Sequence, residues 1–366
     1  MLEVHEAAGA LERIETELRG AGFFDADGIA AGDRCADVYL GFGLADGLRR
    51  GGRAAPPEPA ALPLAACRVR DADEPPPGSV GTPPDEPRSS MGFEVGAWQA
   101  TWTAAEYAGA VERVREAIAD GEVYQVNLVQ HLAAPFRGDA SVLGRALAGF
   151  RPLAPRPLQG DGWTIASASP ELFLARRGKR LWTMPIKGTR PAGQEAALRA
   201  SDKDAAEHVM IVDLERNDLG RVCQPGSVRW PEVMTARPLA GVVHLVSTVE
   251  GVLRPEVTWR DIIAAVFPGG SVTGAPKVAA LDHIAALEPV GRGASMGALG
   301  TVWPNGDFEL ALTIRTFAVV AERIHLWVGG GVVWDSDPWA EVEESWVKAR
   351  PLLAALDHPS RTTSWA

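Results

Sequence analysis

Two stretches of the 366-residue chain place carboxylates at helical spacing. In the first, SDKDAAEHVMIVDLERNDLG, Asp204 and Glu207 lie three residues apart and continue the apolar line of Ile211 and Leu214. Residues three or four apart share one face of a helix, so these two acids are expected on the buried side. A carboxylate on a buried face needs a partner, such as a cation or a hydrogen-bond donor.

The second acidic helix is predicted from residue 337 onward. Asp337 suits the N-cap and Pro338 the first helical position, and Glu341, Glu344 and Lys348 then share a face. If the two acidic faces meet, their carboxylates surround a hard divalent cation, and Mg²⁺ typically takes one or two protein carboxylates together with water and substrate oxygens. Spacing alone equally fits a solvated helix face whose acids pair with lysine or arginine.

Two glycine-rich segments could present backbone N–H groups to an anion. They are FPGGSVTGAPK (267–277), which contains Thr273, and WVGGGVVWDSDP (327–338). Consecutive glycines allow close approach to the amides, and the first segment opens a helix whose N-terminus favours negative charge. It lacks the G-K-[ST] ending of a Walker A loop, so phosphate is not implied. Tight turns alone would also explain both segments.

Lys187 stands in TMPIKGTR, between an apolar strand and a Gly-Thr turn. A lysine at a strand end is usually exposed and inert. If the lysine is instead held in a partly desolvated pocket, its pKa falls and the free amine becomes a nucleophile. The residues alone leave both interpretations open.

Helices and strands must hold these candidate residues. Residues 103–119 are predicted as a helix, because apolar residues recur on one face and Thr103 and Glu106 are spaced as a capping box. Strand patterns cover 123–132, 164–186 with a turn near Gly178, 242–249, 308–320 and 323–334. Many strands joined by tight turns favour antiparallel sheets with helices packed outside them, and therefore the α+β fold class.

The composition excludes some partners. With 36 Lys and Arg against 47 Asp and Glu, the formal net charge is −11, which argues against nucleic acid or an anionic membrane as the main partner. Three widely spaced cysteines and the lack of an export signal or long apolar stretch predict a cytoplasmic protein. A proline-rich, mobile loop is expected at about 71–90, separating an N-terminal segment (1–94) from a catalytic block (95–358) and a tail (359–366).

The motifs, in their order along residues 95–356, resemble the chorismate-binding enzymes. This family includes anthranilate synthase component I, aminodeoxychorismate synthase component I, and the isochorismate and salicylate synthases. The resemblance rests on VYQVNL, ASPELF, MPIKGTR, AEHVMIVDLERNDLG, HLVSTVEG, FPGGSVTGAPK, TIRTF and GGGVVWDSDPWAEVEESWVKA. It implies a sandwich-like core of antiparallel sheets, as in anthranilate synthase component I.

The resemblance also implies a set of site residues. Glu207 and Glu344 would ligate Mg²⁺, with Asp204 and Glu341 as outer-shell carboxylates. Lys187, Glu171 and His244 would be catalytic, Glu171 in proton transfer and His244 near the ring hydroxyl that leaves. The residues expected to bind chorismate are Gln125, Gly188, Thr189, Thr273, Ser295, Arg315, Gly329, Gly330 and Gly331. Arg315 would pair with the pyruvyl carboxylate.

Two positions separate the branches of the family. The water-using isochorismate and salicylate synthases have a lysine base where Gln125 stands, and a glutamine cannot act as that base, so ammonia is the expected nucleophile. Anthranilate synthases usually have alanine where Lys187 stands, whereas aminodeoxychorismate synthases have lysine. The resemblance therefore favours aminodeoxychorismate synthase component I, in which the lysine amine adds to the ring, expels the hydroxyl and is displaced by ammonia.

This branch makes 4-amino-4-deoxychorismate for p-aminobenzoate and folate, or for a secondary metabolite. Ammonia is expected from a separate glutamine amidotransferase subunit. Two alternatives stay open: anthranilate synthase component I, and a catalytically impaired chorismate-binding homologue. Ser295 departs from the family, which usually has a tyrosine there that contacts the substrate carboxylate. The shorter serine hydroxyl predicts a looser hold on chorismate.

Overall fold

The structure is a computed structural model that describes residues 1–25, 32–50, 54–78, 92–191, 193–200, 202–239 and 242–357. The strands are β1 (Leu2–Val4), β2 (Arg34–Leu40), β3 (Ala65–Asp71), β4 (Phe93–Val95), β5 (Gln99–Ala100), β6 (Gln125–Gly138), β7 (Leu158–Gly160), β8 (Trp163–Ser167), β9 (Leu172–Arg177), β10 (Arg180–Met184), β11 (Ile186–Pro191), β12 (Arg229–Leu239), β13 (Val242–Val252), β14 (Gly274–Ala275), β15 (Ala298–Val302), β16 (Phe308–Leu312), β17 (Thr316–Val320) and β18 (Arg323–Val332). The helices are α1 (Ala10–Gly20), α2 (Ala104–Ala119), α3 (Leu143–Leu147), α4 (Glu195–Arg199), α5 (Asp202–Gly220), α6 (Trp259–Val266), α7 (Lys277–Leu287) and α8 (Pro338–Leu356), with 3₁₀ turns η2 (Phe42–Leu48), η4 (Ala140–Val142), η5 (Ala148–Phe150) and η6 (Gly270–Val272).

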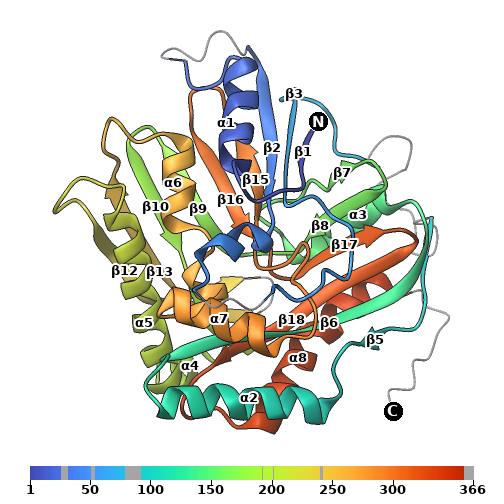
Figure 1. Cartoon of the computed structure of the whole chain (residues 1–366), viewed down its shortest axis with the longest axis vertical. Helices are drawn as coiled ribbons and strands as arrows, with labels where there is room; N and C mark the ends of the chain where they lie inside the picture. Colours follow the sequence, from blue (N-terminus) through green and yellow to red (C-terminus); the bar gives the residue numbers. More distant parts are fainter. Residues whose placement is uncertain are drawn as a thin grey trace.

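The described strands form two antiparallel sheets, one of ten strands and one of eight (Figure 1). The larger sheet has the order β1-β3-β2-β15-β16-β9-β10-β13-β11, and β12 also pairs with β13. The smaller sheet has the order β14-β6-β18-β17-β8-β7, and β4 and β5 pair with β6. Two antiparallel sheets with separate helices confirm the α+β prediction.

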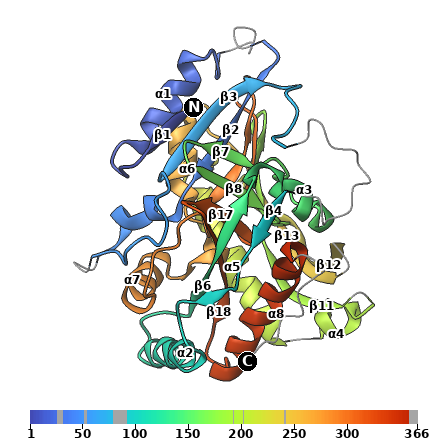
Figure 2. The same ribbon diagram turned by 90° about the vertical axis from the view of Figure 1, so that its right-hand side faces the viewer.

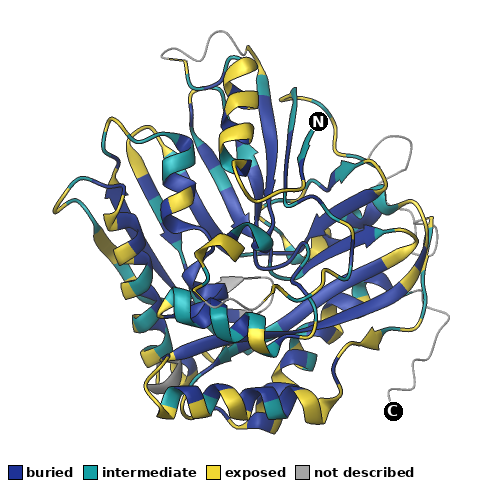
Figure 3. Cartoon of the chain, viewed as in Figure 1, coloured by how far each residue is buried: buried dark blue, intermediate teal, exposed yellow. Residues whose placement is uncertain are grey.

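Helices cover the outer surfaces of the sheets. α2 and α8 pack against each other, and α8 packs on β18. α5 packs on β13 and β11 of the larger sheet, and α1 and α6 pack together farther along it (Figure 2). The strands are mostly buried, whereas α1, α2 and α8 each expose one side (Figure 3). None of the described helices is both long and apolar enough to cross a membrane.

Local sequence signals account for the ends of several elements. The capping box of α2 is confirmed, because Glu106 N donates to Thr103 Oγ1 (3.2 Å) and Thr103 N donates to Glu106 Oε2 (2.8 Å). Asp337 caps α8 by accepting from Ala340 N at 2.8 Å, and Pro338 begins the helix as predicted. Gly178 has a φ of 57° in the turn between β9 and β10, a conformation that glycine adopts without steric cost.

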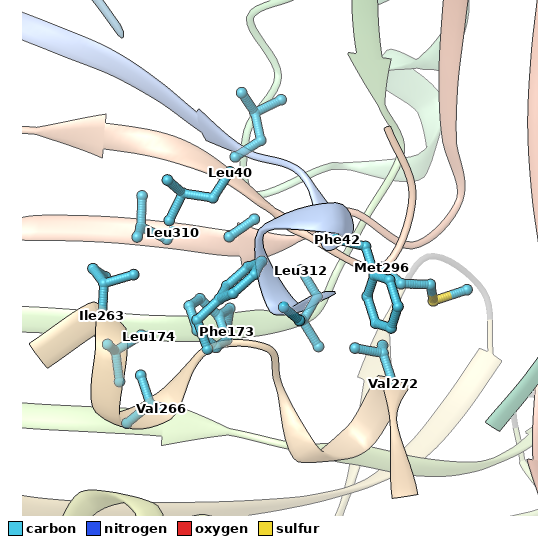
Figure 4. Close-up of a cluster of buried hydrophobic side chains, with 14 of the residues drawn as sticks. Leu40, Phe42, Phe173, Leu174, Ile263, Val266, Val272, Met296, Leu310 and Leu312 are labelled. Atoms are coloured by element: carbon cyan, nitrogen blue, oxygen red, sulfur yellow. The ribbon is translucent and has the colours of Figure 1, made fainter. Parts of the chain in front are cut away.

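A cluster of buried side chains joins the larger sheet to α6 and η6 (Figure 4). Phe173 of β9 meets Phe267 edge-on at 5.9 Å between ring centroids, and Leu312 of β16 lies beside it. Burial of one such side chain contributes about 1.5–3 kcal/mol. The cluster therefore fixes the segments that lead to residues 169–171 and 270–273.

The N-terminal segment completes the larger sheet. β2 pairs with β15 in continuous register from Leu40 opposite Ala298 to Ala36 opposite Val302. Residues 79–90 of the predicted proline-rich loop (about 71–90) and the predicted tail (359–366) lie outside the described residues. The division of the chain near residue 94 into an N-terminal segment and a catalytic block stays a prediction.

Candidate active site

Glu171 and Arg315 lie where the chain passes from one sheet to the other. Glu171 lies between β8 of the smaller sheet and β9 of the larger sheet, and Arg315 lies between β16 and β17. The two crossovers are joined, since Ala168 N donates to Arg315 O at 3.0 Å. Arg315 has a φ of 51°, which residues other than glycine rarely adopt and which is often found at functional sites. The junction of the two sheets therefore holds one carboxyl group and one guanidinium group. The guanidinium group belongs to the residue with the strained backbone, Arg315.

Glu171 is a buried acid with several nearby donors and cations. Ile186 N donates to its Oε1 at 3.4 Å, and the Ser271 side chain is also hydrogen-bonded to it. Burial raises the pKa of Glu171, although Lys187 and Arg315 act in the opposite direction. A carboxyl group with a raised pKa can both give and take a proton, which suits acid–base work.

Lys187 of β11 is paired with Glu207 of α5. The Lys187 Nζ lies 2.8 Å from Glu207 Oε1, and both side chains are largely buried. Burial alone would lower the pKa of Lys187, but the charge and hydrogen bond of Glu207 outweigh burial and raise it. The sequence left the state of this lysine open, and the carboxylate of Glu207 beside it sets the direction of the shift.

Glu207 accepts a second hydrogen bond on the same oxygen. Gln125 of β6 donates from Nε2 to Glu207 Oε1 at 2.9 Å. Burial would raise the pKa of Glu207, but Lys187 and, farther away, Lys348 hold it below its usual range. Gln125 Oε1 is buried and has no hydrogen-bond partner among the described residues. That oxygen is an unsatisfied acceptor on the side chain that holds Glu207.

The two acidic helices approach the same glycine run of β18. Lys348 Nζ lies 2.8 Å from Glu344 Oε1 on α8 and also donates to Gly329 O at 2.8 Å. A Cβ atom on Gly330 would lie 3.4 Å from Glu344 Oε1, and one on Gly331 would lie 2.7 Å from Glu207 Oε1. The charge of Glu344 also acts on Glu207 and raises its pKa. The carboxylates of α5 and α8 therefore both lie against this glycine run.

This donor set fits Mg²⁺. Glu207 and Glu344 offer oxygen ligands. In this structure a lysine ammonium group compensates the charge of each carboxylate, Lys187 for Glu207 and Lys348 for Glu344. Glu341, in the first turn of α8, accepts from Ser336 Oγ at 2.7 Å. Among the described residues no group of three or more His, Cys, Asp or Glu forms a closed cage. Magnesium commonly keeps several waters and binds through one or two carboxylates, so an open pair suits it.

His244 of β13 is held in one tautomer. Its Nδ1 lies 2.8 Å from Gly188 O, and a carbonyl oxygen can only accept, so Nδ1 carries the proton and Nε2 is the acceptor. Burial lowers the pKa of His244, and Arg315 and Lys348 lower it further, so the ring is neutral at pH 7. The predicted residues Thr189 and Asp204 have side chains outside the described part of the chain.

Two predicted substrate contacts direct their hydroxyl groups into the protein. Ser295 is fully buried and donates from Oγ to Thr313 O at 3.1 Å. Thr273 is also fully buried and donates to Gly269 O at 2.9 Å. Both hydroxyls hold loops in place, and their contact with a substrate stays a prediction.

Sequence reasoning missed the ion pair between Glu288 and Arg292. Arg292 Nη2 lies 2.6 Å from Glu288 Oε1, and the two side chains are only 1% and 2% exposed. Arg292 also donates to Val272 O at 2.8 Å and to Asn127 O at 2.7 Å. The pair ties β6, which carries Gln125, to the turn that carries Thr273. Its only signal was the four-residue spacing of opposite charges in LEPVGRG.

Comparisons with known proteins identify the family of the chain. A family model described as chorismate binding enzyme matches residues 61–354. Anthranilate synthase component 1 of Streptomyces coelicolor is 40% identical over 272 residues, covering 71% of this chain and 53% of that protein. Aminodeoxychorismate synthase component 1 of Klebsiella aerogenes is 40% identical over 271 residues, covering 71% and 60%. The chain thus spans just over half the length of these relatives. The crystal structure of anthranilate synthase component I from Streptococcus pneumoniae superposes with a TM-score of 0.76 at 26% identity, covering 87% of this chain and 80% of that one.

Proposed function

This chain belongs to the family of chorismate binding enzymes, and from that premise we propose that it is an aminodeoxychorismate synthase, which replaces the ring hydroxyl of chorismate by an amino group from ammonia. The observation that carries the proposal is Lys187, whose Nζ is buried among Glu207, Glu171 and Gln125 in the proposed site. Relatives named for aminodeoxychorismate and for anthranilate synthesis are about equally similar overall, so the choice between them depends on this residue.

Substrate binding follows from the charges of the site. Chorismate carries two carboxylates, and the acidic protein must offset that charge locally. Arg315 can bind one carboxylate with a planar guanidinium, and the amides of Gly329, Gly330 and Gly331 can approach it closely. Glu207 and Glu344 would hold Mg²⁺, which supplies a positive charge for the other carboxylate. Without a cation at this point, the two glutamates would repel the substrate.

The chemical steps use side chains already described. The cycle starts from the free amine of Lys187, whose ammonium proton has passed to solvent; Nζ attacks the ring, and the double bonds shift to expel the hydroxyl. The hydroxyl takes the proton of Glu171 and leaves as water. Ammonia then attacks the carbon that lost the hydroxyl, the double bonds shift back, and Lys187 leaves as a neutral amine. The new ammonium group returns a proton to Glu171, so the sum is chorismate plus ammonia giving aminodeoxychorismate plus water.

Gln125 and His244 suit an ammonia nucleophile. Gln125 cannot remove a proton from water, but its buried Oε1 can accept a hydrogen bond from ammonia. His244, neutral and acceptor at Nε2, can orient the ring hydroxyl that leaves. We further propose that a separate glutamine amidotransferase subunit supplies the ammonia, as the component 1 names of the relatives imply for those proteins.

The product identifies the function. Purified protein should convert chorismate with ammonium salt and Mg²⁺ into a compound that keeps the enolpyruvyl group, as detected by mass spectrometry. Anthranilate and pyruvate would instead assign the chain to the anthranilate branch, and isochorismate would assign it to the water-using branch. Ammonium salt bypasses any missing partner, so a complete lack of turnover would favour an impaired homologue.

A further inference from the structure

A chain of buried hydroxyl groups joins the crossover that carries Glu171 to the crossover that carries Arg315. Ser167 ends β8 and Thr316 begins β17, and the two residues lie opposite each other in this antiparallel pair. Their hydroxyl oxygens are 2.8 Å apart, and both residues are buried, Thr316 completely. The proposed chemical steps use neither of them.

The direction of each hydrogen bond in this chain follows from its neighbours. Thr316 Oγ1 lies 2.9 Å from Ile314 O, and a carbonyl oxygen can only accept, so the threonine donates its proton to Ile314. Ser167 must then donate to Thr316. Ser167 Oγ accepts from Ser169 N at 3.2 Å, and Ser169 Oγ accepts from Glu171 N at 3.3 Å. The chain therefore runs without a break from Ile314 O to the amide of Glu171.

The hydrogen bond from Thr316 to Ile314 O spans Arg315. Arg315 has a strained φ of 51°, and such a backbone persists only where the surrounding structure holds it. The bond ties the residues on either side of Arg315 to each other and so supports this strained turn. Because both hydroxyls are buried, the loss of one leaves the other without a partner or water to replace it.

The guanidinium of Arg315 and the carboxyl group of Glu171 are close enough for each charge to act on the pKa of the other. Two backbone hydrogen bonds also join their crossovers, from Ala168 N to Arg315 O and from Leu312 N to Glu171 O, both at 3.0 Å. The backbone bonds set the spacing of the two crossovers, and the hydroxyl chain adds the only side-chain link that reaches both sides of Arg315 among the hydrogen bonds described here.

We propose that Thr316 and Ser167 are positioning residues, whose linked hydroxyls hold the guanidinium of Arg315 in the place that chorismate requires relative to Glu171. The inference rests on the proposed function, which assigns a substrate carboxylate to Arg315 and the proton transfer to Glu171. Neither hydroxyl needs to touch the substrate. A misplacement of about 1 Å in a group that binds or reacts with the substrate can cost about 100-fold in rate.

The first test is the KM for chorismate, measured from its consumption with saturating ammonium salt and Mg²⁺. Thr316→Val removes the hydroxyl but keeps the shape of the side chain, and it should raise KM about tenfold. Thr316→Ser keeps the hydroxyl and should return KM to within about twofold of the wild type. Ser167→Ala breaks the same bond from the other end and should raise KM by a similar factor. An unchanged KM in both Thr316→Val and Ser167→Ala would overturn the proposal.

KM separates positioning from a loss of stability. Partial unfolding lowers kcat and leaves KM unchanged, because KM describes only the molecules that remain folded. The matched control is Thr164→Val on the same strand β8. Thr164 is 5% exposed, its Oγ1 accepts from Gln159 Nε2 at 3.3 Å, and it pairs with Val319, away from both crossovers. The control should keep the KM of the wild type, and an equal rise in KM would show a general loosening of the sheet and refute positioning.

A double-mutant cycle tests whether Thr316 acts through Arg315. Arg315→Gln removes the guanidinium, so in that background Thr316→Val should raise KM by less than about twofold. The same tenfold rise with and without the guanidinium would contradict the proposal.

The consumption of chorismate does not depend on which product forms. If the product is anthranilate, the proposed function fails, and the comparison of KM values still decides the inference. If no chorismate is consumed, its Kd measured by calorimetry with Mg²⁺ replaces KM. Thr316→Val should then weaken binding about tenfold, and an unchanged Kd would overturn the proposal.

Discussion

Replacing Gly331 by alanine would place a methyl group against the pair that orients Glu207. The Cβ atom would lie 1.9 Å from Gln125 Nε2 and 2.7 Å from Glu207 Oε1. Both distances are shorter than real contacts, so the Gln125 side chain must move away from the carboxylate. The backbone of Gly331 does not adopt a positive φ, so the substitution acts through this contact alone.

The magnitude follows from two effects. A hydrogen bond to a charged acceptor contributes about 1.5–3 kcal/mol. Forcing one more carbon into a packed interior costs about 1–3 kcal/mol. When Gln125 moves, it loses the hydrogen bond and at the same time relieves part of the overpacking, so the two costs do not simply add. We therefore expect Gly331→Ala to lower the free energy of unfolding by about 2–4 kcal/mol. The misplaced carboxylate should also weaken Mg²⁺ binding by about 10- to 100-fold, as is typical when a partner of a metal ligand is lost.

The neighbouring glycine provides the control. A Cβ atom on Gly330 would lie 3.3 Å from Lys348 Nζ and 3.4 Å from both Glu341 Oε2 and Glu344 Oε1, so these side-chain ends need to move by only a few tenths of an ångström. Gly330→Ala should therefore change the free energy of unfolding by less than about 1 kcal/mol. Urea denaturation of the two variants measures the difference.

A double-mutant cycle isolates the contact. In a Gln125→Ala background the shorter clash is gone and only the 2.7 Å contact with Glu207 Oε1 remains, so Gly331→Ala should then cost clearly less than in the wild type. If Gly331→Ala is as stable as the wild type, or is equally destabilised with and without Gln125, the steric account of this site is wrong.

Four further predictions follow from the same structure. Replacing Lys187 by alanine should reduce chorismate turnover at least about 100-fold with the substrate KM little changed, and an unchanged rate would remove Lys187 from the nucleophile role. Excess chelator should abolish turnover, and added Mg²⁺ should restore it, whereas full activity in chelator would refute the metal site. Arg292→Met should destabilise the protein by about 3–5 kcal/mol in urea denaturation, because Glu288 would be left charged and buried, and Arg292→Met with Glu288→Gln should recover much of that loss. Burial lowers the pKa of His131 to about 3 and that of His325 to about 4, so both are neutral in the fold, and stability should decrease as pH falls from about 6.5 to 4 because the unfolded state binds the protons. Replacing both histidines by phenylalanine should flatten that slope, and an equal slope would contradict the assignment.

The sequence by itself determined the class of fold and the identity of most candidate residues. Alternating strands, the capping box at Thr103 and the N-cap at Asp337 are local signals, since each depends on residues within one or two turns. The motif order from residue 95 onward was enough to indicate the family, whose model matches residues 61–354.

Only the tertiary structure decided how the candidate residues act on one another. Glu207 is 20 residues from Lys187 and 82 from Gln125 along the chain, yet one of its oxygens accepts from both. A pKa depends on such neighbours in space, and for this reason the sequence left both interpretations of Lys187 open. Glu215 was invisible for the same reason. A glutamate in a helix of many charges has no sequence signal, and Glu215 becomes notable only when packing buries it near Glu171 and Asp218.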